Sequence, residues 1–241
     1  MAECPTIKRA VIACRVMEQE LNRLLPQCPA DISISLRFLD QQLHLSPEKM
    51  PAAVQSAIDE AAAWADEIVL GYGLCSNGIV GVSAAAQNLY VPRVHDCVAL
   101  LLGSRKAYYK VFRERPGTYF IAPGWVKAQK DPLGLLENEY IPRMGREDAL
   151  WGIQEELKHY SHIALINTRV CDSADLRRRA KENARFLDKD YMEIKGSPAY
   201  FKKILFGPCT EPDFVCLPPG AQVRQRPFLA SPEQSISNCC N

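Results

Sequence analysis

Four cysteines of this chain follow short apolar segments, and their thiolates could act together as ligands. Each apolar segment has the composition of a buried strand, and a predicted helix follows each cysteine. Because the carboxyl ends of parallel strands meet at one edge of a sheet, we expect these thiols to converge on one metal ion or cluster. Thiolates are the preferred ligands of zinc and of iron–sulfur clusters. The alternative is that they are separate packing cysteines, a common role of free Cys. The four are Cys14, Cys75, Cys97 and Cys171.

The sequence His95-Asp96-Cys97 adds a second kind of ligand. His-x-Cys with a distant Cys171 resembles the zinc pattern of cobalamin-dependent and cobalamin-independent thiol methyltransferases, whose zinc holds a substrate thiol as a thiolate. Zinc lowers the pKa of a bound thiol in this way. We therefore treat His95, Asp96 and Arg93 as candidate catalytic residues. Asp96 would orient His95, and the planar fork of Arg93 would bind a carboxylate or phosphate. The alternatives are a hydrogen-bonded loop histidine and an aspartate that caps the next helix.

His44 and Trp125 are further candidates for this site. His44, in Asp-x-x-Leu-His, is expected to be a metal ligand or a substrate contact, with a surface or capping histidine as the alternative. Trp125 follows Pro123-Gly124 and is a candidate wall of a cofactor pocket, or simply a half-buried hydrophobic residue.

A glycine-rich loop carries Cys75. Gly71, Gly73 and Gly78 precede a small-residue segment, roughly 79–87, for which we expect a helix. They are candidate cofactor-binding residues, because backbone N–H groups at a helix start can hold a phosphate or carboxylate. The motif departs from the dinucleotide fingerprint, so close backbone approach is the preferred explanation.

Strands and helices alternate along the chain, which predicts an α/β fold with a mostly parallel, Rossmann-like sheet and helices on both faces. We expect two lobes with a cleft between them. Residues 1–122 would carry the Cys14, Cys75 and Cys97 site, residues 123–220 would form a second α/β lobe, and residues 221–241 a loose tail. Cys216 lies in an apolar strand and is expected to be a core residue.

Composition limits the classes of function. The chain has 241 residues, 47% of them hydrophobic, and a net charge of +1, which favours neither nucleic acid nor an anionic membrane as a partner. No apolar run reaches the roughly 20 residues of a membrane span, and no signal peptide is recognised, so we expect a cytoplasmic protein. Ten cysteines are many for a reducing compartment and favour metal binding. Cys239 and Cys240 are expected to be incidental.

Several longer motifs resemble an uncharacterised family, a domain of unknown function common in anaerobic bacteria and methanogens. The resemblance covers most of residues 7–220. Members of that family often lie beside corrinoid methyltransferase systems, so the resemblance implies a link to methyl-group metabolism. One departure is Arg15, which stands where a glycine commonly follows the first cysteine. The motifs are Ile12-Ala13-Cys14, Leu39-Asp40-x-x-Leu43-His44, Leu70-Gly71-Tyr72-Gly73-Leu74-Cys75-Ser76-Asn77-Gly78, Pro92-Arg93-x-His95-Asp96-Cys97, Gly103-Ser104 and Pro123-Gly124-Trp125.

The leading functional hypothesis is a metal site built from Cys14, Cys75 and Cys97, with His95, Cys171 or His44 completing it. Zinc would activate a thiol for methyl transfer, whereas a [4Fe–4S] cluster with one open iron would suit lyase chemistry. A small molecule or a corrinoid protein is the expected partner. Two alternatives stay open: a non-catalytic accessory protein that handles corrinoid or metal, and an α/β domain with purely structural cysteines.

Overall fold

The computed structural model describes residues 6–229, and within them the chain forms two separate β-sheets. The larger sheet has five strands in the order β2-β1-β3-β4-β8, and only β8 is antiparallel to its neighbour. The mixed α/β fold with a mostly parallel sheet is therefore confirmed. The strands are β1 (Ile7–Cys14), β2 (Ile32–Leu39), β3 (Glu67–Gly71), β4 (Asn88–Pro92) and β8 (Phe214–Leu217).

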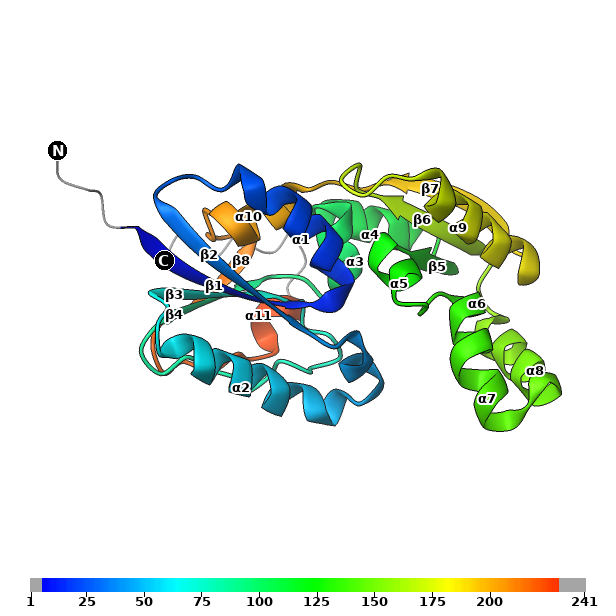
Figure 1. The fold of residues 1–241 in the computed structure, drawn as a ribbon, viewed down its shortest axis with the longest axis horizontal. Coiled ribbons are helices and arrows are strands. Elements are labelled where there is room, and N and C mark those ends of the chain that lie inside the picture. The colour runs from blue at the N-terminus through cyan, green and yellow to red at the C-terminus, as the bar shows by residue number, and fades with distance from the viewer. Residues whose placement is uncertain (1–5, 230–241) are drawn as a thin grey trace.

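Burial explains the positions of these strands. The last six residues of β1 are buried, as expected for a strand covered on both faces, whereas β2 alternates between half-buried and exposed residues at the sheet edge. Figure 1 shows α1 and α10 on one face of the sheet and α2 on the other. β2 follows β1 in the sequence and pairs with one side of it, whereas β3 pairs with the other side of β1. The strand order therefore reverses between β1 and β3. Ligands of such sheets bind at this reversal, beyond the strand carboxyl ends.

The described helices vary from single turns to 13 residues. The α-helices are α1 (Glu18–Leu24), α2 (Met50–Ala62), α3 (Cys97–Leu102), α4 (Arg105–Glu114), α5 (Pro123–Lys127), α6 (Pro132–Leu135), α7 (Ile141–Met144), α8 (Arg146–Leu157), α9 (Ala174–Phe186), α10 (Ala199–Phe206) and α11 (Arg226–Leu229). The short 3₁₀ helices are η1 (Arg15–Met17), η2 (Leu25–Gln27), η3 (Gln41–Leu45) and η4 (Pro47–Lys49), and η5 (Leu136–Tyr140) is a π-helix. None of the helices in the described range is long and apolar enough to cross a membrane.

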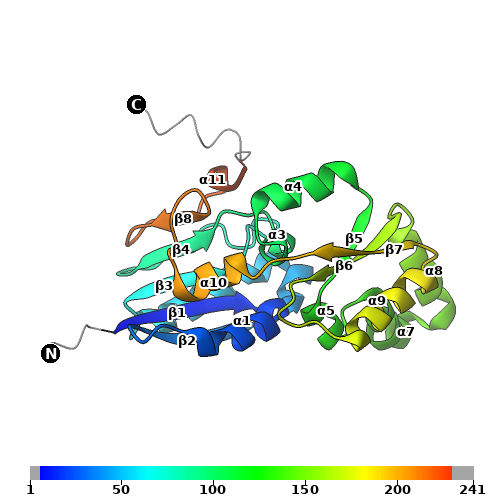
Figure 2. The ribbon, with the colours of Figure 1, turned by 90° about the horizontal axis from the view of Figure 1, so that it is seen from above.

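The second sheet is parallel, in the order β5-β6-β7, and has its own hydrophobic cluster. Between β5 and β6 the chain leaves the sheet as a helical arm of α6, η5, α7 and α8, which projects from the body in Figure 1. Figures 1 and 2 both place α3 and α5 where the two sheets meet. The strands are β5 (Thr118–Ile121), β6 (His162–Asn167) and β7 (Asp190–Lys195).

The two sheets are interleaved along the chain. β5 precedes residue 122 but pairs with β6, while β8, far beyond that residue, returns to pair with β4. α10 also returns to the first sheet, where the buried Arg9 of β1 donates to the Leu205 carbonyl of α10 at 2.7 Å. The lobes expected at residues 1–122 and 123–220 therefore exchange elements: the first is completed by residues from the second.

Three local expectations differ from the structure. The segment after Gly78 is a series of turns rather than a helix, and Gln55 holds it by hydrogen bonds with the backbone of Ser83. Residues 221–229, expected in a loose tail, are packed: Val223 and Phe228 are buried. Backbone hydrogen bonds join Val223 to residues 81 and 82. Cys216, expected in the core, is exposed because its strand lies at a sheet edge. Residues 230–241 lie outside the described part.

Candidate functional site

Three thiols meet at the carboxyl edge of the large sheet. Cys14 is the last residue of β1, Cys75 follows β3 by four positions, and Cys97 begins α3 just after β4. Their three strands are parallel neighbours, so their carboxyl ends share an edge. All three are free and buried. Two of them flank the β1–β3 reversal of strand order, the usual ligand position of this fold class.

The pKa values of the thiols show that they are neighbours. Burial raises the pKa of Cys14 to about 11. Burial and then the charge of Cys14 raise the pKa of Cys75. Burial, Asp96, Cys75 and Cys14 together raise the pKa of Cys97. Negative charge on one sulfur therefore opposes ionisation of the others, and without a cation these thiols stay protonated at neutral pH.

The buried phenol of Tyr72 lies near the three cysteines. Tyr72 is 1% exposed, and burial followed by the charges of Cys14, Cys75 and Cys97 raises its pKa. Its hydroxyl has no hydrogen-bond partner among the described protein groups. A buried hydroxyl without a partner costs about 1–3 kcal/mol, so such groups usually have a reason. A group bound between the thiols would supply the missing partner.

Glycines allow the Cys75 loop to close on the Cys97 loop. A Cβ on Gly73 would lie 2.7 Å from the Asp96 backbone nitrogen, and one on Gly71 would lie 2.6 Å from the Ala13 Cβ. The Cys75 N–H then donates to the His95 carbonyl at 2.8 Å. The Cys75 residue itself takes a positive φ of 47°, uncommon outside glycine.

Each of the three predicted cofactor-binding glycines thus has a packing role, since a Cβ on Gly78 would meet the Met50 sulfur.

His44 joins the edge from η3. Its Nε2 lies 3.9 Å from the Cys14 sulfur, the outer limit of a sulfur hydrogen bond. Burial lowers the pKa of His44 against the opposing effect of Asp96, so the imidazole is neutral at neutral pH and able to bind a metal. The Asp40 side chain, which accepts from the Gln42 N–H at 2.8 Å, caps this short helix and fixes its position.

Two of the predicted catalytic residues, His95 and Asp96, contact residues of α3 and α4. Asp96 caps α3: its Oδ1 accepts from the backbone N–H groups of Val98 and Ala99, and its Oδ2 accepts from the Tyr108 hydroxyl at 3.0 Å. His95 Nε2 lies 2.9 Å from the Tyr109 hydroxyl. In the described residues no hydrogen bond links the two side chains, so the capping alternative describes Asp96.

Arg93 is directed toward the loop before β8. Its side chain pairs with Glu211, and its backbone N–H donates to the Asp213 carbonyl at 2.7 Å. The Arg93 guanidinium is therefore engaged in joining β4 to the returning C-terminal segment.

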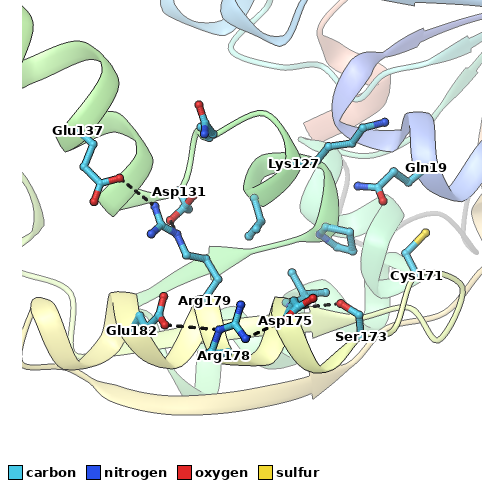
Figure 3. A pocket seen from close by; sticks show the side chains of 14 residues that line it. Gln19, Lys127, Asp131, Glu137, Cys171, Ser173, Asp175, Arg178, Arg179 and Glu182 are labelled. Carbon is cyan, nitrogen blue, oxygen red and sulfur yellow. Dashed lines mark hydrogen bonds and ion pairs between the residues drawn. The ribbon is translucent and has the colours of Figure 1, made fainter.

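Cys171 lies apart from the other three predicted ligands. It follows β6, a strand of the second sheet, and it lines a separate cavity of about 470 Å³. Figure 3 shows Cys171 beside Gln19 at one end of this cavity and Arg179 with Asp131 at the other. Burial and then Glu20 raise the pKa of Cys171 to about 12, with no contribution from another cysteine.

A larger cavity, about 620 Å³, opens beside Cys97. It lies between the sheet edge and the helical arm, and Trp125 stands in its wall as expected for a pocket residue. His44, Asp96 and Cys97, which the sequence also singled out, line it too. Sequence reasoning did not find the remaining lining residues, since they come from η3, β5 and the arm, with no shared motif. They include Gln41, Tyr119, Leu135, Tyr140 and Arg143.

Within residues 6–229, no group of three or more His, Cys, Asp or Glu side chains is arranged so that it could hold a metal ion as it stands. The thiols are therefore neighbours without forming a preassembled ligand set. The remaining cysteines outside this range are Cys4, Cys239 and Cys240.

Fold and site together define an α/β protein that gathers thiols at the switch point of a parallel sheet, next to a cavity. The chain belongs to the family described as "Protein of unknown function (DUF1638)", whose model matches residues 38–205. This confirms the family resemblance seen in the sequence. Comparison with curated protein sequences gave no match.

Proposed function

We propose that this protein binds a thiophilic metal centre, zinc or a [4Fe–4S] cluster, through Cys14, Cys75 and Cys97. One observation carries the proposal: three buried free thiols lie near enough to Tyr72 for their charges to raise its pKa, and its hydroxyl has no partner in the described structure. Thiolate ligands suit both kinds of centre, and metal binding would replace the three thiol protons. Because the described residues contain no preassembled ligand group, loading requires the cysteine side chains to turn toward one another.

His44 is the fourth protein group that we assign to this centre, as a ligand or as a hydrogen-bond partner of Cys14. Cys171 has no part in it, because its strand belongs to the other sheet. If His44 is a hydrogen-bond partner and not a ligand, the three thiolates leave one position of a zinc ion or one iron of a cluster open for a substrate. The cavity beside Cys97 would give a substrate access to that open position.

We place this activity in corrinoid-dependent methyl-group metabolism. Zinc would hold a substrate thiol as the nucleophile that accepts the methyl group; a cluster would instead support lyase chemistry at its open iron. The support is the thiol set itself, together with the link to methyl-group metabolism that the family resemblance implies.

The first experiment is metal and sulfide analysis of the full chain after anaerobic purification and reconstitution. We expect about one zinc per chain, or about four iron and four sulfide, and Cys75→Ser should lose most of it. Tyr72→Phe removes only the unpartnered hydroxyl and should weaken metal affinity about tenfold.

Cys171→Ser is the matched control, because it removes a buried thiol from the other cavity. It should keep the full metal content. A wild-type chain that stays metal-free under these conditions, or equal metal loss in the Cys75 and Cys171 variants, would contradict the proposal.

A second candidate is the non-catalytic accessory protein. The helical arm favours it, because Trp151 is 68% exposed and Met144 is 46% exposed, and exposed large apolar groups are common at partner contacts. Methyl transfer from a methylated corrinoid to a thiol separates the two: the enzyme needs Cys75 for turnover, whereas the accessory protein shows no turnover and binds its partner in a Trp151-dependent way.

A further inference from the structure

The 620 Å³ cavity beside Cys97 is of the size that holds a small organic molecule. Its walls come from three parts of the fold. The sheet edge supplies Gln41, His44 and Cys97, and the junction of the two sheets supplies Tyr119 and Trp125. The helical arm supplies the opposite wall, with Leu135, Tyr140 and Arg143 among its residues. A ligand held here therefore reaches from the arm toward the thiols.

Most charged groups of this cavity already have partners within the protein. Asp96 caps α3, and Lys130 pairs with Glu139. Glu156 accepts from the Tyr140 hydroxyl at 2.9 Å. Together with Val98, Leu135 and the aromatic rings, these satisfied groups form a largely apolar wall. The body of a ligand that fits this wall is apolar.

Arg143 and Gln41 are polar residues of the wall whose side chains leave groups unpaired within the described part of the chain. Arg143 makes no ion pair or hydrogen bond within the described range, although it lies close enough to Tyr140 to lower the pKa of that phenol against stronger opposing effects. Gln41 is 8% exposed, and its buried Oε1 has no hydrogen-bond partner among the described groups. A guanidinium fork matches a carboxylate, and an amide oxygen accepts from an N–H or O–H group.

We propose that this cavity binds a small organic acid with an apolar body, whose carboxylate pairs with Arg143 and whose other end faces Cys97. A hydroxyl or amine on that body donates to Gln41 Oε1. The inference rests on the proposed function in one respect: this acid would be the substrate brought to the centre at the thiols.

The test uses isothermal titration calorimetry with two probes, 6-hydroxy-2-naphthoate and its methyl ester. They share the apolar body and the hydroxyl and differ in the negative charge. We expect the wild-type chain to bind the acid about tenfold more tightly than the ester, the effect of one charge-assisted contact at an exposed arginine. Arg143→Gln should remove that preference and leave ester binding unchanged.

Arg146→Gln is the matched control, an exposed arginine at the start of α8 that does not line the cavity, and it should keep the preference. Leu135→Trp fills the cavity and should abolish binding of both probes, with thermal unfolding checking that the variant folds. The proposal is overturned if neither probe binds the wild-type chain, if acid and ester bind equally, or if Arg143→Gln keeps the preference.

Metal analysis of the same samples separates this proposal from the previous one. If the acid preference persists in a chain that binds no metal, the cavity assignment holds and the metal assignment fails. If metal binds through Cys75 but the probes show no preference, the reverse is true.

Discussion

Tyr72, Gln41 and Glu20 each bury polar atoms without a hydrogen-bond partner in the described part of the chain. Such groups cost about 1–3 kcal/mol each, so a fold keeps them mainly where they meet a ligand or serve a function. Tyr72 lies among the thiols and Gln41 lines the cavity beside Cys97. Glu20 lies on α1, away from both, and Gln87, Arg93 and Asp131 bury further unpartnered atoms without lining this cavity.

Glu20 should make stability depend on pH. The carboxyl is fully buried, and burial raises its pKa from 4.5 to about 7. Its stabilising effect is present below about 4.5 and is lost as the pH rises through about 7, because the charged form is disfavoured only in the folded chain. We expect Glu20→Gln to gain on the order of 3 kcal/mol over wild type across this range.

Urea unfolding of both proteins as a function of pH measures this difference. A stability difference that does not change with pH would show that Glu20 titrates in the folded chain as it does in the unfolded one.

At the scale of elements, the site depends on how closely the β3 and β4 loops approach each other. Gly73 lets the two backbones touch, and the hydrogen bonds from Leu74 to Val94 and from Cys75 to His95 follow from that contact. Asp96 then caps α3 at the same place, which fixes Cys97 at the helix start. One close backbone contact therefore positions two of the three thiols.

Gly73→Ala should separate these two loops. Its Cβ would lie 2.7 Å from the Asp96 nitrogen, a backbone atom that cannot turn aside, so we expect a loss of about 1–3 kcal/mol in stability and reduced metal binding. Thermal unfolding and metal content measure both effects.

Gly152→Ala is the control, because that helical position has nothing within 4 Å and should gain about 0.5–1 kcal/mol. Equal effects of the two substitutions would contradict this account of Gly73.

Local patterns were enough to predict the strands and three of the thiol positions. The apolar runs that end at Cys14, Gly71 and Pro92 became β1, β3 and β4, because buried parallel strands are apolar along their whole length. The same rule failed for Cys171. Carboxyl ends share an edge only within one sheet, and the sequence near β6 does not show that this strand belongs to another sheet.

The cavity also lay beyond prediction from the sequence. Gln41, Tyr119 and Arg143 are brought together by the position of the arm, which no spacing along the chain encodes. The turn after Gly78 was mistaken for a helix because its small residues resemble a helical segment. Cys75, Ser76 and Asn77, just before this segment, take positive φ values of 47°, 55° and 67°, which a helix does not contain.

At the scale of the whole molecule, the two sheets do not divide the chain into an N-terminal and a C-terminal half. β8 and α10 complete the first sheet from residues beyond 198, and Ile166 of β6 packs in the same hydrophobic cluster as β1 and β3. The first sheet therefore depends on a distant segment, whereas the second sheet and its own hydrophobic cluster come from one continuous stretch, residues 118–195.

A fragment of residues 1–122 should therefore fail to fold. It lacks β8 and α10 and leaves β5 without its partner β6. We expect no cooperative thermal transition by circular dichroism, whereas the full chain should show one, and adding residues 123–241 in trans should restore it. A cooperative transition in the isolated fragment would disprove this interdependence.

The pairing of Val223 with residues 81 and 82 also orders events during protein synthesis. The thiols leave the ribosome within the first hundred residues, but the loop that carries Cys75 is braced by a segment translated more than a hundred residues later. Nascent chains fold from the N-terminus, so this region stays without its partner segment until Val223 has been synthesised. The loop that carries Cys75 therefore reaches its final packing only after that distant segment has been made.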